Sequence, residues 1–190
     1  DLSFDQMRGD FASRFAPYYQ SMKGGGFARM QREGADYQQC YYRHASNITG
    51  PGHASLLTGC YPTKTGIVGN DFCDGATLTC GYCVGDDSSA YSARNLLVPT
   101  LGDVLRVRSP KSKTVSLALK DRAAILMAGH SATACLWFDA QSQKFETSNA
   151  YPTPSWLSTA NARVNDSLNA CEHRSWNTII PDNQHPAYDS

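Results

Sequence analysis

The feature that most constrains the fold is a compact apolar run that leads directly into three charged residues. The run covers residues 114–119, TVSLAL, and has the length and the β-branched residues of a single strand. A short continuous apolar run of this kind is typical of a strand buried in a parallel sheet. The charged residues Lys120, Asp121 and Arg122 then come at the carboxyl end of that strand, where open α/β sheets bind ligands.

The segments around this run alternate between helix and strand patterns. Residues 95–108 carry leucine and valine at helical intervals and predict a helix packed on one face, even with Pro99 near its first turns. Residues 134–147 predict a hairpin that turns near Gln141, and residues 155–168 predict a modest helix. The alternation predicts an α/β fold with a mainly parallel sheet. The other expected elements are the end of a strand at 2–4, a helix over 11–19, a helix at 27–32 that Gly34 ends, and a strand at 37–42.

Composition excludes some classes of function. The chain has 190 residues and a mass of 20.7 kDa, which is enough for one domain with a real core or for part of a larger one. Its 17 basic and 17 acidic residues cancel, so global charge does not point to nucleic acid as a specific partner. No apolar run approaches the roughly 20 residues that span a bilayer, so a membrane is not expected either.

Seven cysteines are many for a cytosolic enzyme and favour an oxidising compartment, which predicts a periplasmic or secreted protein with disulfides. Cys73, Cys80 and Cys83 are crowded into a polar loop that extends to about residue 92. A disulfide there would staple an insertion. A zinc knuckle is the weaker alternative, because three cysteines lack a fourth ligand nearby.

The stretch NITGPGHASLLTG predicts a short helix. Pro51 suits a first helical turn, and Gly59 suits the end of the helix. Thr49 then stands at the helix start, which a purely structural reading explains as an ordinary N-terminal residue. The same geometry directs unpaired N–H groups and a partial positive charge outward, so a threonine oxygen held there can meet a phosphate.

Four further candidate residues have plain structural alternatives. Side chains two apart on a strand share a face, so Lys120 and Arg122 are expected to project together while Asp121 points away. The alternative is a solvated charged turn. Asp5 alone reads as a helix N-cap before Gln6, and Asn70 alone reads as a turn residue after glycine.

Taken in order, five blocks resemble the alkaline phosphatase superfamily. The blocks are DQMRGD, NITGPGHASLLTG, YPTKTGIVGNDF, SLALKDRAAILMAGH and LWFD. The likeness is to bacterial alkaline phosphatases with a threonine nucleophile and a lysine and an arginine in the active site. It implies an alkaline-phosphatase-like three-layer α/β sandwich, of which this chain would be the N-terminal portion. Residues 73–92 would form a cysteine-containing loop, and residues 134–190 a hairpin or insert region.

The resemblance also implies a role for each candidate. Asp5 matches a zinc ligand, and Thr49 matches the nucleophile, which coordinates the same zinc. Asn70 matches a side chain that hydrogen-bonds a phosphoryl oxygen, and Lys120 and Arg122 match the pair that contacts the transferred group. The implied enzyme holds two Zn²⁺ ions and hydrolyses a broad range of phosphate monoesters through a phosphothreonine intermediate.

A charge argument favours monoesters over diesters. A phosphate monoester carries nearly two negative charges near neutral pH and a diester carries one, so the cationic pair Lys120 and Arg122 suits the monoester. The related phosphodiesterases and nucleotide pyrophosphatases, which generally lack this pair, remain the alternative, together with a non-catalytic phosphate-binding module.

The zinc ligands beyond Asp5 and Thr49 are expected outside this chain, in the remainder of the same enzyme, because a catalytic zinc ordinarily takes about three protein ligands. His44, His53 and His130 are expected to serve hydrogen bonding and packing instead. Asp182 and His185 are not expected to bind metal, since they are three apart in a Pro-flanked segment.

Overall fold

The computed structural model describes residues 2–19, 26–37, 39–172 and 174–175. The chain divides into two compact units, one formed by residues 1–42 with 174–190 and the other by residues 43–173. No helix among the described residues is long and apolar enough to cross a membrane.

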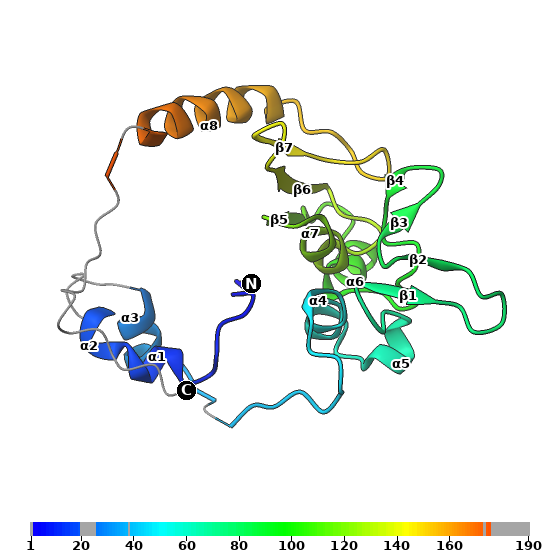
Figure 1. The fold of residues 1–190 in the computed structure, drawn as a ribbon, viewed down its shortest axis with the longest axis horizontal. Helices are drawn as coiled ribbons and strands as arrows, with labels where there is room; N and C mark the ends of the chain where they lie inside the picture. Colours follow the sequence, from blue (N-terminus) through cyan, green and yellow to red (C-terminus); the bar gives the residue numbers. More distant parts are fainter. Residues whose placement is uncertain (1, 20–25, 38, 173, 176–190) are drawn as a thin grey trace. The chain divides into compact units, whose positions relative to one another are not determined.

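The described residues of the smaller unit form three short helices, α1 (Phe11–Arg14), α2 (Ala16–Tyr19) and α3 (Gly26–Glu33) (Figure 1). The predicted end of α3 before Gly34 is confirmed. The strands predicted at 2–4 and 37–42 are wrong for the residues described there, which form no strand. Tyr37 and Tyr41 are about four-fifths exposed, so these apolar side chains do not mark a buried strand.

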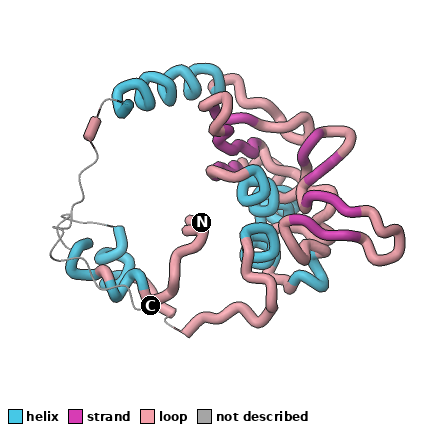
Figure 2. Tube along the Cα trace, viewed as in Figure 1, coloured by secondary structure: helices cyan, strands magenta, loops and turns pink. Residues whose placement is uncertain are grey.

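The larger unit is built on a three-stranded sheet in the order β5 (Val115–Ala118), β6 (Ala134–Asp139), β7 (Lys144–Glu146) (Figure 2). Strands β5 and β6 are parallel and are joined by helix α7 (Asp121–Ala128), whereas β6 and β7 form an antiparallel hairpin. The parallel pair and the predicted hairpin are therefore both confirmed. Because β5 leads into α7, residues 119–122 lie at the carboxyl end of β5, at one end of the strands of the sheet.

Two predictions about burial in this unit are wrong. Strand β5 lies at one edge of its sheet and is not fully buried, since Val115 and Leu117 are about 60% exposed. The predicted helix over 95–108 is confined to α6 (Leu101–Arg108). Its start is fixed by Thr100, whose side chain accepts a hydrogen bond from the backbone N–H of Asp103, and its apolar side chains are largely exposed. The spacing of the apolar residues predicted that a helix is present, but it did not predict where the helix begins or that its apolar side chains are exposed.

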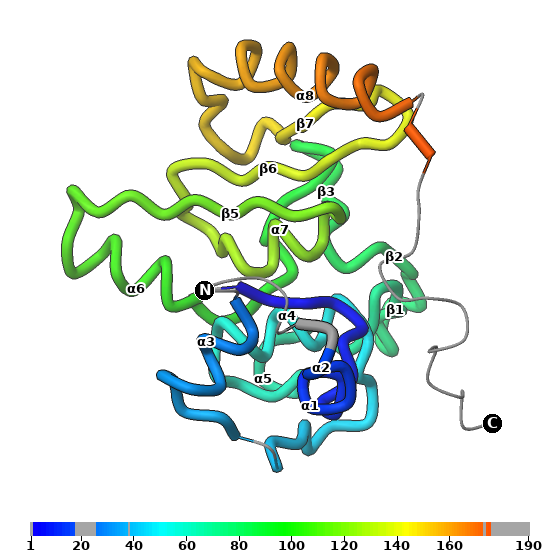
Figure 3. Tube along the Cα trace, turned by 90° about the vertical axis from the view of Figure 1, so that its left-hand side faces the viewer, coloured from blue at the N-terminus to red at the C-terminus, as the bar shows by residue number. Residues whose placement is uncertain are grey.

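Helix α8 (Leu157–Glu172) follows the hairpin and packs beside β7, which confirms the helix predicted at 155–168 (Figure 3). The side-chain amide of Asn161 accepts a hydrogen bond from the backbone N–H of Phe145 at 2.8 Å and donates one to its carbonyl oxygen at 3.0 Å. These two bonds satisfy backbone groups at the outer edge of β7.

The core lies around α7, which packs against α4 (Thr49–Thr58) and against β5 and β6. Ala54 of α4 and three consecutive residues of α7, Ala124 to Leu126, are fully buried. Gly59 ends α4 in a left-handed conformation with φ of 67°, as predicted. Around this core lie the short helix α5 (Pro62–Thr65) and two small hairpins, β1 (Asp71–Cys73) with β2 (Cys80–Tyr82) and β3 (Gly85–Asp86) with β4 (Ala90–Tyr91).

The first of these hairpins is closed by a disulfide between Cys73 and Cys80, which face each other in the strand register. The predicted staple is thus confirmed. The zinc knuckle is wrong, because two of its three cysteines are bonded to each other and Cys83 is a buried free thiol.

Candidate active site

Thr49 is the first residue of α4 and is 8% exposed. The residue in the N-cap position is Ile48, whose side chain makes no capping hydrogen bond. Thr49 is therefore not the cap itself but sits inside the first turn. His53 lies one turn later, and its Nδ1 is 2.8 Å from the Thr49 carbonyl oxygen. This contact confirms the expected hydrogen-bonding role of His53.

Asn70 is held against the start of the same helix. Its Oδ1 accepts a hydrogen bond of 2.8 Å from the backbone N–H of Gly50, one of the groups that a helix N-terminus leaves without an intrahelical partner. Because Oδ1 is the only acceptor of the amide, this bond sets the amide's orientation and turns its NH₂ donors the other way. The backbone carbonyl of Asn70 also accepts a hydrogen bond of 2.8 Å from the backbone N–H of Cys83. Asn70 is therefore held by its side chain to α4 and by its backbone to the residue that follows β2.

Arg122, in the first turn of α7, is bound by Tyr82. Its Nη1 donates to the Tyr82 hydroxyl at 2.9 Å, and that hydroxyl donates to Asp121 Oδ1 at 2.6 Å. Burial, and then the hydrogen bond to Asp121, raise the pKa of Tyr82 well above its ordinary value, so the hydroxyl keeps its proton. Burial alone would lower the pKa of Arg122, but the hydrogen bond to Tyr82 and the nearby Tyr82, Asp121 and Cys83 together raise it, and the guanidinium stays charged.

The Nε atom of Arg122 is buried and has no hydrogen-bond partner among the residues that the structure describes. A buried guanidinium N–H without a partner is costly, and an anion bound in front of it would remove that cost. It is one of several buried polar atoms without a partner in the described residues, and the one that belongs to a guanidinium.

Lys120 occupies the N-cap position of α7, two residues beyond β5. Together with Asp121 and Arg122 it lines a cavity of about 320 Å³ at the carboxyl ends of β5 and β6. The expectation that Asp121 points away from its neighbours is wrong. Strand alternation does not apply to it, because β5 ends at Ala118 and Asp121 already belongs to the helix.

The larger unit therefore joins three separate segments through one chain of contacts. Gly50 contacts Asn70, Asn70 contacts Cys83, and the neighbouring Tyr82 contacts Arg122. Sequence reasoning missed Tyr82, since it is separated from Arg122 by 40 positions and no local pattern links the two.

Asp5 belongs to the smaller unit and Thr49 to the larger one. Over the described parts of the chain, no group of three or more histidine, cysteine or carboxylate side chains is gathered for a metal. The residues present thus do not by themselves fit a complete zinc site.

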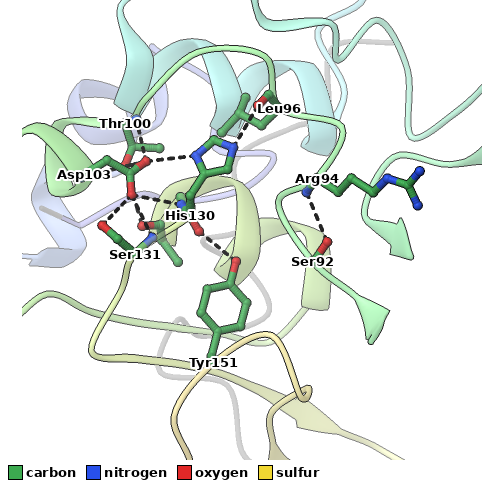
Figure 4. A network of polar contacts seen from close by, with 10 residues as sticks. Ser92, Arg94, Leu96, Thr100, Asp103, His130, Ser131 and Tyr151 are labelled. Atoms are coloured by element: carbon green, nitrogen blue, oxygen red, sulfur yellow. Dashed lines mark hydrogen bonds and ion pairs between the residues drawn. The ribbon is translucent and has the colours of Figure 1, made fainter. Parts of the chain in front are cut away.

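A second polar network holds the other end of α7 (Figure 4). Asp103 accepts hydrogen bonds from the backbone N–H groups of Thr100, His130 and Ser131. Burial alone would raise the pKa of Asp103, but these bonds, with those from the side chains of Ser131 and His130, lower it to about 2. His130 also lies 2.9 Å from the Leu96 carbonyl through Nε2, which confirms its expected hydrogen-bonding role. The network is structural and ties α6 to the loop after α7.

His44 likewise bonds locally, with Nδ1 3.1 Å from the Ser46 carbonyl oxygen and its ring against Tyr61. The expected role of His44 in hydrogen bonding and packing is confirmed. Asp182 and His185 lie outside the described residues.

Residues 2–183 match the sequence profile of the type I phosphodiesterase / nucleotide pyrophosphatase family. The chain belongs to this family. The family lies within the alkaline phosphatase superfamily, so the resemblance seen in the sequence is confirmed.

The chain is similar to two curated alkaline phosphatases. It is 36% identical over 199 residues to PafA from Elizabethkingia meningoseptica, covering 97% of this chain and 35% of PafA. It is 35% identical over 193 residues to PhoV from Synechococcus elongatus, covering 95% of this chain and 34% of PhoV. The chain thus spans about a third of the length of these relatives.

Two crystal structures of PafA share the fold. The wild-type structure superposes with a TM-score of 0.86 at 34% identity, covering 95% of this chain and 36% of PafA. A variant in which a threonine, an asparagine, a lysine and an arginine are replaced superposes with a TM-score of 0.87 at 32% identity, covering 96% and 37%. The predicted α/β fold of the alkaline phosphatase type is confirmed.

Proposed function

We propose that the full-length protein is an alkaline phosphatase that hydrolyses small phosphate monoesters of broad range through a phosphothreonine intermediate on Thr49. Asn70 donates a hydrogen bond to a phosphoryl oxygen, and Lys120 and Arg122 neutralise the transferred group. The observation that carries the proposal is the chain of contacts that links the start of α4 to Asn70 and to Arg122, whose buried Nε lacks a protein partner within the described residues.

The orientation of the Asn70 amide suits this chemistry. The bond from Gly50 to Asn70 Oδ1 leaves the amide NH₂ as the group that faces a ligand. Two cations near the site favour a phosphoryl group with nearly two negative charges over one with a single charge. Preorganised donors of this kind stabilise charge in the transition state without having to reorganise.

The PafA variant adds support from a relative. The threonine and asparagine replaced in that protein are as far apart in sequence as Thr49 and Asn70, and the replaced lysine and arginine are separated by one residue, as Lys120 and Arg122 are. The same four residue types in the same local spacing support the assignment of these side chains to one site.

Metal is part of the proposal. Asp5 and Thr49 are proposed as ligands of one Zn²⁺, and the other ligands of a two-zinc site would lie beyond the described residues, in the remainder of the enzyme. Bound zinc would make the threonine alcohol a competent nucleophile at neutral pH. In this division the present chain is an N-terminal portion of the catalytic domain that supplies the nucleophile and the phosphate contacts.

A phosphodiesterase or nucleotide pyrophosphatase is the second candidate, since the matching family is named for these activities. The two are separated by comparing kcat/KM of the full-length protein for an aryl phosphate monoester and for the corresponding bis-aryl diester. A clear preference for the diester would refute the monoesterase.

A non-catalytic phosphate-binding module is the third candidate. Intact mass and zinc analysis of the purified protein separate it from the enzyme: a 20.7 kDa species without zinc supports the module, and a much larger zinc protein supports the enzyme. The Cys73–Cys80 disulfide supports a periplasmic or secreted location, because disulfides persist in oxidising compartments.

A further inference from the structure

We propose that Tyr82 is a positioning residue that holds Arg122 in the orientation needed to bind the phosphoryl group. The inference rests on the proposed function of Arg122. Tyr82 lies in the cysteine-containing loop, a part of the chain to which the proposal above assigns no role in the reaction.

The contacts of the Tyr82 hydroxyl are directional. It accepts from Arg122 Nη1 at 2.9 Å and donates to Asp121 Oδ1 at 2.6 Å, so its hydrogen-bonding order is defined. The guanidinium carbon of Arg122 also lies 5.9 Å from the centroid of the Tyr82 ring. With Nη1 engaged in this way, the Nε atom is left as a buried donor for a ligand.

The same hydroxyl bridges the ion pair of Arg122 and Asp121, whose side chains are not hydrogen-bonded to each other directly. The two side chains are close, with Arg122 Nη1 3.9 Å from Asp121 Oδ1, a separation too long for a hydrogen bond. That oxygen accepts the Tyr82 O–H and the backbone N–H of Arg122, each at 2.6 Å. Without the Tyr82 hydroxyl, the ion pair is free to shorten into a direct side-chain hydrogen bond, which would turn Arg122 away from the phosphoryl group and reduce its effective charge.

Tyr82 is itself fixed by the fold. It ends strand β2, opposite Asp71 in β1, and the Cys73–Cys80 disulfide closes the hairpin formed by these two strands. Its ring packs edge-on against Tyr91 at 6.3 Å between centroids. The hairpin therefore carries Asn70 just before one strand and Tyr82 at the end of the other, so one stapled element contacts both α4 and α7.

The test is a double-mutant cycle in the full-length, zinc-loaded protein. Tyr82→Phe, Arg122→Ala and the double variant are compared with the wild type for turnover of an aryl phosphate monoester and for inhibition by inorganic phosphate. Tyr151→Phe is the matched control, because its buried hydroxyl donates to the Gly129 carbonyl at the other end of α7. Urea denaturation of every variant measures stability separately.

We expect Tyr82→Phe to lower kcat/KM about tenfold and to weaken phosphate inhibition, since small misplacements of a catalytic group have effects of this order. In the Arg122→Ala background the same change should cost less than about twofold, because its effect passes through Arg122. Tyr151→Phe should lower stability without changing kcat/KM. Equal losses from Tyr82→Phe in both backgrounds, or no loss in either, would overturn the inference.

Failure of the proposed function can be distinguished from failure of the inference about Tyr82. If the wild type hydrolyses no phosphoester, the proposed function is refuted, and calorimetric titration of the same proteins with inorganic phosphate decides the role of Tyr82. Weaker phosphate binding in Tyr82→Phe, with no further loss in the double variant relative to Arg122→Ala, supports it. Unchanged binding refutes it.

Discussion

Replacing Gly50 by alanine tests whether stability and phosphate binding depend on the close approach of Asn70 to the start of α4. A Cβ atom at Gly50 would lie 3.1 Å from Asn70 Oδ1, 3.2 Å from the Gly69 carbonyl oxygen and 3.3 Å from the Cys83 sulfur. These three atoms belong to different residues of the loop packed on the helix, and Cys83 is fully buried. They cannot all move away without displacing the loop that carries Asn70.

The expected change in the free energy of unfolding of Gly50→Ala is the balance of two opposing contributions. Adding a methyl group to a packed region costs about 1–3 kcal/mol. Alanine is better than glycine in a helix by up to about 1 kcal/mol, which offsets part of that cost. We expect Gly50→Ala to lower the free energy of unfolding by about 1–2 kcal/mol and to weaken phosphate binding.

Gly52 provides a matched control in the same helix, because a Cβ atom there would meet nothing within 4 Å. Gly52→Ala should therefore leave stability unchanged or raise it by up to about 1 kcal/mol. Urea denaturation gives the stabilities, and inhibition of monoester turnover by inorganic phosphate gives the binding. If Gly50→Ala behaves like Gly52→Ala in both assays, the packing argument at the helix start is wrong.

Four further results are expected. Thr49→Ala should leave the fold intact and abolish the covalent intermediate, measured by mass spectrometry after acid quenching; a persisting phosphoprotein would exclude Thr49 as the nucleophile. Lys120→Ala should reduce kcat/KM for a monoester more than for a diester, and equal losses would contradict the charge argument. Replacing Cys73 and Cys80 together by serine should lower the free energy of unfolding by about 2 kcal/mol, as expected for a small disulfide loop. An unchanged midpoint of urea denaturation would show that this disulfide does not stabilise the fold. Asp103 has a pKa lowered to about 2, so the stability it contributes is present above pH 4 and is lost as the pH falls from about 4 to 2. Asp103→Asn should remove this contribution, about 2 kcal/mol, and flatten the acid limb of stability against pH; an unchanged acid limb would show that Asp103 does not control it.

The elements predicted best from the sequence are those whose limits have a local cause. Helix α4 ends at Gly59 because glycine tolerates the left-handed conformation found there. The hairpin around Gln141 is also local, since its two strands are adjacent in sequence. The position of Lys120 and Arg122 just after a strand was also predicted from neighbouring residues, whereas the alternation used to orient their side chains does not apply beyond Ala118.

Burial was predicted poorly because it depends on neighbours that the local pattern does not contain. The run at 114–119 reads as a buried strand, yet β5 is an edge strand with Val115 and Leu117 exposed. The start of α6 was predicted too early, although Thr100 and Asp103 have the spacing of a capping box, a signal that locates a helix start.

The contacts of the candidate site could not be predicted from local sequence patterns, because they join residues far apart in the sequence. Asn70 reaches Gly50 across 20 positions, and Tyr82 reaches Arg122 across 40. Only the order of five blocks, compared with a known family, indicated that these segments act together. The resemblance identified Asn70 and Arg122 but gave no reason to single out Tyr82.

The hydrogen bonds of Asn70 and Arg122 bear on how variants are interpreted. Both side chains, proposed to bind phosphate, are positioned by hydrogen bonds inside the larger unit, and the proposed zinc ligand Asp5 belongs to the smaller one. Tyr82→Phe should therefore weaken phosphate affinity while leaving zinc content unchanged, whereas Asp5→Ala should lower zinc content directly. Gly50 does not separate the two effects, because it is the neighbour of the proposed zinc ligand Thr49. Loss of zinc along with phosphate affinity in Tyr82→Phe would contradict this separation.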